Sequence, residues 1–208
     1  MLAILRTASI LTIFAILGGG LVAFSYQTTI TQIKTNEREA LLRTLTALVP
    51  VSTYNNDLFT DIKKMPSKEL GIDGNLTIHI ARKDKKPVAA ILTPTAPDGY
   101  NGRINMLVAV NYAGVVIGVR VVSHKETPGL GDKVELLRSK WILGFNGHSL
   151  LDPTDKDWKV KRDGGIFDQF TGATVTPRAV VKTVHKTLRF YWQNREKIFE
   201  LKQVAKQD

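Results

Sequence analysis

The apolar residues form one continuous stretch at the start of the chain and shorter, patterned segments after it. No charged residue occurs between positions 7 and 33, and residues 8–26 are the most apolar part. Because about 20 apolar residues cross the hydrocarbon core as a helix, this stretch predicts a single membrane span. A cleaved signal peptide is the competing interpretation, but the apolar run is long and shows no small-x-small cleavage site near Val22. We therefore expect residues 1–34 to form an uncleaved membrane anchor.

A second segment, residues 35–74, combines a helical pattern with an irregular one. Leucines recur at helical spacing at positions 41, 45 and 48, and Pro50 ends the pattern. This amphipathic helix either continues the membrane helix as a stalk or packs on the domain that follows. The rest of the segment, up to residue 74, contains Asn, Pro and Gly signals and is predicted to be an irregular connection.

Residues 75–208 are predicted to form one domain that begins with two β-hairpins. Apolar residues alternate in 76–81 and 88–92, and again in 104–110 and 115–121, with turn residues between the members of each pair. The proline- and glycine-containing stretch between the hairpins, 94–102, is predicted to be a loop. On the first strand, His79 is expected to be a surface or half-buried side chain.

Two helices are expected after the hairpins. Asp132, with Glu135 three residues later, predicts a capping box for a helix over residues 133–145. Pro177 suits the first position of a final helix that extends to about Leu201, and Thr176 is the predicted N-cap. A short strand is expected around residues 158–161. These elements predict an α+β fold in which a mostly antiparallel sheet is flanked by helices.

The stretch that leads into the final helix is the first candidate site. Gly172 and Ala173 keep this turn small enough for a bulky group to approach the backbone. Thr174 lies close to the helix start, where free N–H groups and the helix dipole attract an anion, and Arg178 adds a cation. From these residues alone, an ordinary strand-to-helix turn that binds nothing is the simpler interpretation. The nearby Phe167 and Phe170 suit either core packing or the border of a ligand.

The second candidate site is the loop that follows the second hairpin, Glu126-Thr127-Pro128-Gly129-Leu130-Gly131. Pro128 and Gly129 suit a type II turn, in which glycine accepts a positive φ. Turn formation accounts for these two residues but not for Glu126, Thr127 or Leu130. Such a loop is rich in backbone amides that can lie against a planar ring or its polar edge.

Taken together, the two stretches resemble a known family. Asp168-x-x-Thr171-Gly172-Ala173-Thr174 is similar to the acceptor motif of proteins that carry FMN covalently. The stretch from Ser123 to Lys133, which contains the loop Glu126–Gly131, is similar to the second signature of that FMN-binding domain. With the N-terminal apolar segment, the chain resembles the G subunits of Rnf/Rsx electron-transport complexes over nearly its whole length. Neither motif departs from the family pattern.

The resemblance implies one FMN per chain, joined by a phosphoester to Thr174. An ApbE-type flavin transferase that uses FAD as donor would make the bond. Asp168, Thr171, Gly172 and Ala173 would be read by this enzyme and would shape the turn, and Thr176 and Arg178 would lie beside the phosphate. The loop Glu126–Gly131 would contact the ring or the ribityl chain.

The resemblance further implies an electron-carrier component of an ion-translocating oxidoreductase complex, one that is not catalytic alone. The domain would lie in the periplasm, anchored in the bacterial inner membrane beside other subunits. The charge count does not support that side, since only Arg6 precedes the span whereas Lys34, Arg38 and Arg43 follow it. Two alternatives remain: the homologous C subunit of the sodium-translocating NADH:quinone reductase, and a membrane-anchored scaffold module without flavin.

Composition excludes several other classes. The net charge is +10, from 29 basic and 19 acidic residues, but the basic residues are dispersed, so we expect a solvated basic surface and no contact with nucleic acid. Contact with membrane lipid is expected from the apolar anchor. The chain contains no cysteine, which excludes disulfides and cysteine-ligated iron–sulfur clusters. The four histidines are scattered without a catalytic triad, and the aspartates at 152, 155 and 157 lack the glycine and glutamate of a calcium loop. We expect neither a catalytic residue nor a metal site.

Overall fold

The computed structural model describes residues 1–200 and divides the chain into two compact units, Met1–Thr44 and Leu45–Asp208. Helix α1, Leu2–Leu48, is one continuous α-helix, so the amphipathic segment after residue 35 continues the apolar one. An 18-residue window of α1 has a mean hydropathy of 2.0, and none of that window is buried. By length and composition α1 is able to cross a membrane.

The second unit is built on a sheet of six strands that pair antiparallel throughout. The strands are β1 Ile62–Pro66, β2 Asn75–Lys83, β3 Lys86–Leu92, β4 Thr95–Gly99, β5 Gly102–Asn111 and β6 Val116–Ser123. Their order is β1-β2-β3-β5, and β5 is the central strand. One edge of β5 pairs with β3 near its end and with β4 near its start, while the other edge pairs with β6.

Both predicted hairpins are confirmed. The turn between β2 and β3 has positive φ at Asp84 (52°) and Lys85 (65°), as a two-residue turn that matches the strand twist requires. The β5–β6 hairpin turns at Gly114, whose φ is 90°.

Two strands lie where the sequence predicts irregular structure. β1 lies inside the predicted connection, and β4 lies inside the predicted loop 94–102. Both are short, and both contain a proline, which is tolerated at sheet edges and bulges. The pairing of β4 with β5 shifts register between Ala96 and Gly99, so it lacks the regular alternation by which a strand is recognised.

The prediction of one helix over residues 133–145 is wrong. Two short 3-10 helices occupy this region, Gly131–Val134 and Lys140–Phe145. Asp132 is buried and caps nothing; its Oδ2 lies 3.7 Å from Nε of Arg138. The cap of the second helix is Ser139, whose hydroxyl accepts from the N–H of Trp141 at 3.1 Å. The expected strand near residue 160 is reduced to one parallel bridge between Val160 and Phe167.

The final helix is present as α2, Val175–Phe199, but it begins earlier than predicted. Thr174, and not Thr176, occupies the N-cap position, and its side chain makes no capping hydrogen bond. Pro177 lies within the first turn, where its missing N–H costs nothing. The predicted end at Leu201 lies outside the described residues.

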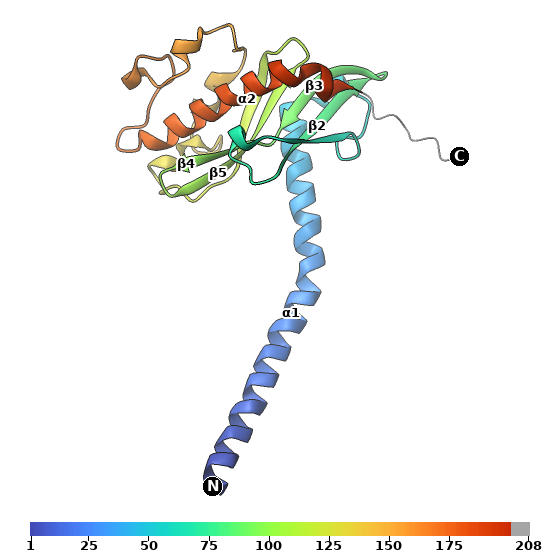
Figure 1. The fold of residues 1–208 in the computed structure, drawn as a ribbon, viewed down its shortest axis with the longest axis vertical. Coiled ribbons are helices and arrows are strands. Elements are labelled where there is room, and N and C mark those ends of the chain that lie inside the picture. The colour runs from blue at the N-terminus through green and yellow to red at the C-terminus, as the bar shows by residue number, and fades with distance from the viewer. Residues whose placement is uncertain (201–208) are drawn as a thin grey trace, which may run out of the picture. The chain divides into compact units, whose positions relative to one another are not determined.

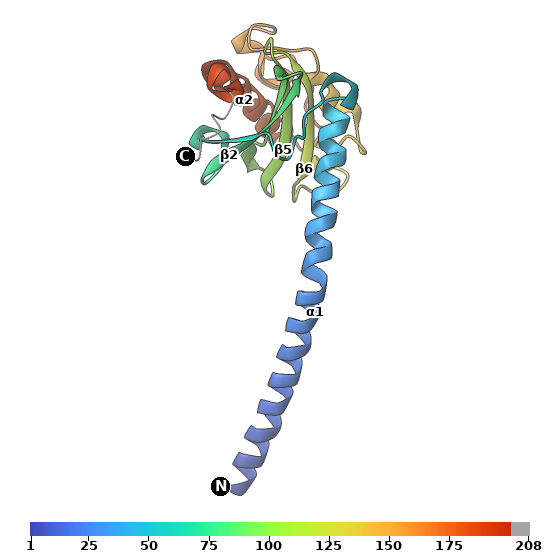
Figure 2. The ribbon, with the colours of Figure 1, turned by 90° about the vertical axis from the view of Figure 1, so that its right-hand side faces the viewer.

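Helix α2 lies across one face of the sheet (Figures 1 and 2). Alternate residues of β5 form the sheet side of this core, and α2 contributes residues at helical spacing. The buried residues of the two layers include Ile104, Met106, Val108 and Val110 from β5, and Val180, Val184, Leu188 and Tyr191 from α2.

The expectation for His79 is wrong, because this side chain is buried, with 5% of its surface exposed. Its Nδ1 lies 2.8 Å from the carbonyl oxygen of Leu58. The ring of Phe59 packs edge-on against the imidazole, with centroids 6.0 Å apart. Burial lowers the pKa of His79 below its usual value, and the hydrogen bond to Leu58 only partly offsets this.

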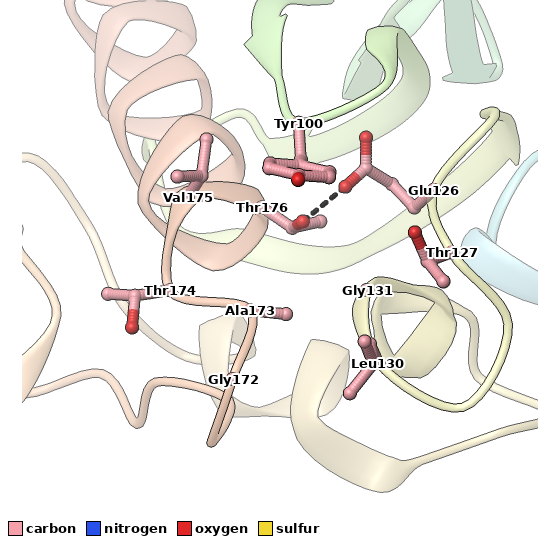
Figure 3. Close-up of a pocket in the computed structure, with 10 residues that line it drawn as sticks. All are labelled: Tyr100, Glu126, Thr127, Leu130, Gly131, Gly172, Ala173, Thr174, Val175 and Thr176. Atoms are coloured by element: carbon pink, nitrogen blue, oxygen red, sulfur yellow. Dashed lines mark hydrogen bonds between the residues drawn. The ribbon is translucent and has the colours of Figure 1, made fainter.

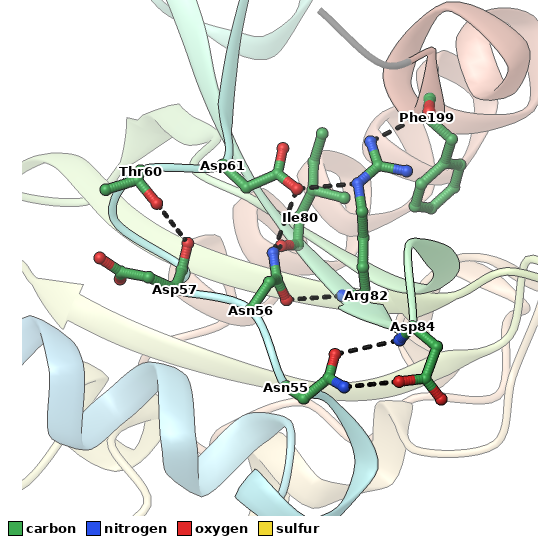
Figure 4. Close-up of polar contacts among 9 residues, drawn as sticks. All are labelled: Asn55, Asn56, Asp57, Thr60, Asp61, Ile80, Arg82, Asp84 and Phe199. Atoms are coloured by element: carbon green, nitrogen blue, oxygen red, sulfur yellow. Dashed lines mark hydrogen bonds and ion pairs between the residues drawn. The ribbon is translucent and has the colours of Figure 1, made fainter.

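A buried arginine joins three parts of the second unit (Figure 4). Arg82, at the end of β2, is 4% exposed. Its Nε donates to Asp61 at 2.8 Å, just before β1, and its Nη2 donates to the carbonyl of Phe199 at 3.0 Å, at the end of α2. Asn56 accepts from the N–H of Arg82 at 2.7 Å. The segment before β1, the sheet and the end of α2 are therefore tied together through one side chain.

Candidate functional site

Three segments that are distant in the sequence enclose a pocket beside the start of α2 (Figure 3). They are the β4–β5 turn, the loop after β6 and the turn before α2. The cavity measures about 380 Å³, within the range of small-molecule sites. It is lined by Tyr100, Glu126, Thr127, Leu130, Gly131, Gly172, Ala173, Thr174, Val175 and Thr176. The two stretches singled out in the sequence thus form one site.

The turn before α2 places a hydroxyl at the rim of this pocket. Gly172 adopts a φ of 80°, and the N–H of Ala173 donates to the carbonyl of Phe170 at 3.1 Å. Thr174 follows at the N-cap position, with its side chain pointing away from Glu126 and Thr176 (Figure 3). The first N–H groups of a helix have no partner within the helix. A group attached to Thr174 therefore lies beside the positive end of α2.

The loop after β6 forms the opposite wall. The N–H groups of Leu130 and Gly131 both donate to the carbonyl of Thr127 at 3.1 Å, and Gly129 has a φ of 78°. This geometry confirms the predicted turn with glycine at its third position. Leu130 remains 42% exposed at the pocket, which leaves an apolar side chain available to a ligand.

Glu126 is buried at the centre of the site, with 5% of its surface exposed. Its Oε1 accepts from the backbone N–H of Asn101 at 3.0 Å, and its Oε2 accepts from the hydroxyl of Thr176. Thr176 is itself fully buried. One carboxylate therefore connects the β4–β5 turn with the first turn of α2.

The side chain of His124 holds the backbone of Glu126 in place. Nδ1 of His124 accepts from the N–H of Glu126 at 3.0 Å, and Nε2 lies 2.8 Å from Oε1 of Glu135. Since Nδ1 acts as an acceptor, a neutral His124 carries its proton on Nε2 and donates it to Glu135. The loop is thus fixed by a chain of hydrogen bonds that ends at the partly exposed carboxylate of Glu135.

Close packing leaves no space for a side chain at Gly131. A Cβ at this position would lie 2.9 Å from Cβ and Oε2 of Glu126 and 2.9 Å from Oγ1 of Thr176. No φ restriction accounts for this glycine, so its role is the close approach of the loop to the carboxylate.

Several of the predicted site residues lie near the pocket without lining it. Pro128 and Gly129 form the turn of the loop, and Thr171 is exposed on the turn before α2. Asp168 pairs with Nζ of Lys161 at 2.6 Å, and its carbonyl accepts from Nε1 of Trp141 at 2.7 Å.

Arg178, which the sequence suggests as a cation for the same corner, already has a partner. Its Nε and Nη2 donate to the two oxygens of Asp163 at 2.5 and 2.7 Å. The paired hydrogen bonds raise the pKa of Arg178 and lower that of Asp163. Both side chains are partly exposed, so the pair is open to exchange with another anion.

Two residues of the site are not recognisable from the sequence. Tyr100 lines the pocket and Asn101 holds Glu126, yet both come from a stretch whose turn residues predict only a loop. No local pattern shows that this turn closes over the distant loop after β6. Phe167 and Phe170, in contrast, are 5% and 6% exposed and belong to the core, not to the pocket lining.

Comparisons with known proteins match both units. An FMN-binding domain family model matches residues 99–189, a range that contains every residue of the pocket lining, and a model described as the RnfG N-terminal region matches residues 1–48. The G subunit of the ion-translocating oxidoreductase complex of Pseudomonas aeruginosa is 49% identical over 97% of this chain and 94% of its own length. The chain belongs to the RnfG family.

Other members of the RnfG family show similar coverage. The G subunits from Shewanella loihica and Vibrio cholerae are 46% and 42% identical over 93% and 94% of this chain, and over 92% and 94% of their own lengths. Among solved structures, the C subunit of the Na⁺-translocating NADH-quinone reductase from Parabacteroides distasonis is 18% identical, with a TM-score of 0.48 over 72% of this chain and 73% of that one.

The residues of the pocket fit the FMN that the domain family implies. An apolar side chain, Leu130, and an aromatic one, Tyr100, are exposed at the pocket and suit a planar ring. The first turn of α2 suits a phosphate. The hydrogen-bonded pair Glu126 and Thr176 adds buried polar atoms to the same lining.

Proposed function

We propose that this RnfG-family chain carries one FMN, attached through a phosphoester to Oγ1 of Thr174, and acts as an electron carrier within its membrane complex. The observation that carries the proposal is the position of Thr174, at the N-cap of α2 and on the rim of a pocket of suitable size. FMN supplies the redox chemistry, and the protein positions it and sets its potential.

Electrostatics favour a phosphoester at this position. The positive end of a helix stabilises an anion within its first turn by about 0.3–1 kcal/mol at an exposed site. Arg178 belongs to the same turn, and a phosphate would compete with Asp163 for its guanidinium. A covalent bond also prevents loss of a flavin whose pocket is open to solvent.

The remaining predicted residues divide into two groups under this proposal. Asp168 and Thr171 are exposed, so an ApbE-type transferase is able to reach them, and Gly172 and Ala173 give the turn its shape. Glu126 to Gly131 form the wall that faces the ring or the ribityl chain.

We also propose that residues 1–34 anchor the chain in the bacterial inner membrane, that 35–74 form the stalk and a connection whose strand β1 joins the sheet, and that 75–208 form the rest of the flavin domain, in the periplasm. Its partners are other subunits of the complex, membrane lipid and the transferase. A tether of this kind replaces diffusion with a high effective concentration of the electron partners.

The attachment is tested by coexpressing the full chain with a flavin transferase and measuring intact mass and in-gel flavin fluorescence after denaturation. The wild type should fluoresce and gain the mass of one FMN, and Thr174→Ala should do neither. Thr60→Ala is the matched control, because Thr60 is an exposed threonine that does not line the pocket, and it should be modified like the wild type. An unmodified wild type from cells with an active transferase would eliminate the carrier proposal and leave the scaffold module.

A further inference from the structure

We propose that the buried carboxylate of Glu126 is a fixed negative charge in the flavin pocket and lowers the reduction potential of bound FMN. This inference rests on the proposed function. The proposed function places Glu126 only in the loop that faces the flavin, and the inference adds an effect of its carboxylate on the flavin potential.

The carboxylate of Glu126 is held by hydrogen bonds and not by a cation. Oε1 and Oε2 both accept hydrogen bonds, from the N–H of Asn101 and the hydroxyl of Thr176. Accepting at both oxygens is the pattern of an ionised carboxylate. The two donors are uncharged, and across residues 1–200 the structure shows no ion pair to Glu126.

The position of the charge is rigid. Gly131 approaches so closely that a Cβ would lie 2.9 Å from Cβ of Glu126, and a Cβ on Gly99 would lie 2.9 Å from Oε1. The backbone N–H is held by His124. Since the carboxylate is immobile, it cannot turn away when the charge of the pocket changes.

Glu126 is also the one carboxylate among the ten residues that line the pocket. Reduction adds electron density to the ring, and a nearby negative charge opposes that change. The interaction is stronger at a buried site than in water, because the effective dielectric constant is lower. The positive end of α2 lies beside both Thr174 and Glu126, since Thr176 of its first turn donates to Glu126, and it offsets part of this charge without removing it.

The test is spectroelectrochemical titration of the full chain, modified by the transferase and purified in detergent. E126Q keeps the size of the side chain and one acceptor oxygen, replaces the other oxygen by an NH2 donor, and removes the charge. We expect E126Q to be flavinylated and its midpoint potential to shift in the positive direction. E135Q is the matched control: it removes a carboxylate from the same hydrogen-bond chain, but one outside the pocket lining, and should keep the wild-type potential.

Three results would overturn the inference: an E126Q potential equal to that of the wild type, equal shifts in E126Q and E135Q, or a folded E126Q that accepts no flavin. The last result would show that the carboxylate of Glu126 is needed for attachment of the flavin. An unmodified wild type would instead defeat the proposed function, before any variant is compared.

Should E126Q fail to fold, redox-induced infrared difference spectra of the wild type with ¹³C-labelled glutamate decide the matter. A carboxylate band that shifts both on flavin reduction and on labelling supports the inference. Its absence shows that no glutamate senses the flavin, and overturns it.

Discussion

Thr174 and Thr176 are separated by one residue, yet their surroundings differ completely. Thr174 lies at the pocket rim and its side chain caps nothing, whereas Thr176 is fully buried and donates to Glu126. The first is therefore available for chemistry, and the second contributes to stability. Substitutions at the two positions should separate these roles.

We expect Thr176→Val to lower the free energy of unfolding by about 1–3 kcal/mol, because it leaves a buried carboxylate oxygen without its donor. Thr174→Ala should change stability by less than about 0.5 kcal/mol while abolishing flavin attachment. Urea unfolding followed by tryptophan fluorescence measures the difference. Equal destabilisation by the two variants would contradict this assignment.

A second prediction at this scale concerns close packing. Gly131→Ala should destabilise the domain by about 1–3 kcal/mol, because the new Cβ overlaps Glu126 and Thr176. Gly144→Ala is the control, since a Cβ there meets no atom within 4 Å. The same unfolding measurement applies, and a Gly131→Ala protein as stable as the control would show that the loop moves aside freely.

Single residues also show how far the sequence predicts the site. Glu126, Leu130, Gly172 and Thr174 are recognisable because they stand in two contiguous motifs, and the structure brings these motifs to one pocket. Tyr100 is not recognisable, since its place in the pocket depends on a contact between distant loops. The surroundings of Arg178 are equally hidden, because its partner Asp163 lies in a separate turn.

Among the elements, α2 has the widest set of connections. Its first turn contributes to the pocket, its length covers the sheet, and the carbonyl of Phe199 at its end accepts from Arg82. Arg82 also pairs with Asp61, whose side chain is 29% exposed. The end of the helix is therefore held by a buried charge whose removal leaves Asp61 without its cationic partner, with only the hydrogen bond from Nδ2 of Asn56 at 3.1 Å.

We predict that Arg82→Met lowers the free energy of unfolding by about 3 kcal/mol, at the low end for a broken buried pair because Asp61 is partly exposed. Arg103→Met is the matched control: its pair with Asp73 is short, at 2.6 Å, but the side chains are 57% and 85% exposed. Its loss should cost no more than about 1 kcal/mol. Urea unfolding measures both variants. An equal decrease in the free energy of unfolding would show that the buried pair stabilises the fold no more than the exposed pair does.

Elements with a regular period are those that the sequence predicts. Apolar residues alternate in the strands of the two hairpins and recur at helical spacing in α2, and all three elements are present. β1 and β4 are short edge segments that contain proline, and their pairing is decided by the neighbouring strand and not by their own pattern. Residues 131–145 form 3-10 helices because the chain there follows the packing of Ile142 and Phe145 into the core.

At the scale of the whole molecule, two histidines make the free energy of unfolding depend on pH. Burial lowers the pKa of His79 and of His185 below the unfolded value of about 6.5. Below that pH the unfolded chain binds protons that the folded chain does not, so stability falls as the pH decreases. Well above the unfolded pKa of about 6.5, both histidines are neutral in the folded and in the unfolded chain, so the stability no longer changes with pH.

We therefore expect the urea midpoint to be constant from about pH 7.5 to 8.5 and to fall between about pH 6.5 and 5. His79→Gln should reduce the slope in the acidic range. All three tryptophans, at 141, 158 and 192, lie in the second unit and report its unfolding. A midpoint that does not change down to pH 5 would contradict burial of a neutral His79.

The absence of cysteine makes the side of the membrane directly measurable. Leu137 is 96% exposed, so Leu137→Cys introduces one accessible thiol into an otherwise thiol-free chain. If the domain is periplasmic, a maleimide that cannot cross the inner membrane should label this variant in intact cells. Labelling only after lysis would place the domain in the cytoplasm.

The pocket has a consequence for the order of events in biosynthesis. Its lining comes from Tyr100, from the loop after β6 and from residues 172–176, and the last of these segments runs into a helix that ends at Phe199. No partial chain that lacks α2 possesses the site. A group bound in the assembled pocket consequently marks a polypeptide that has been synthesised and folded at least through α2, and the fraction of molecules that hold it counts the folded population.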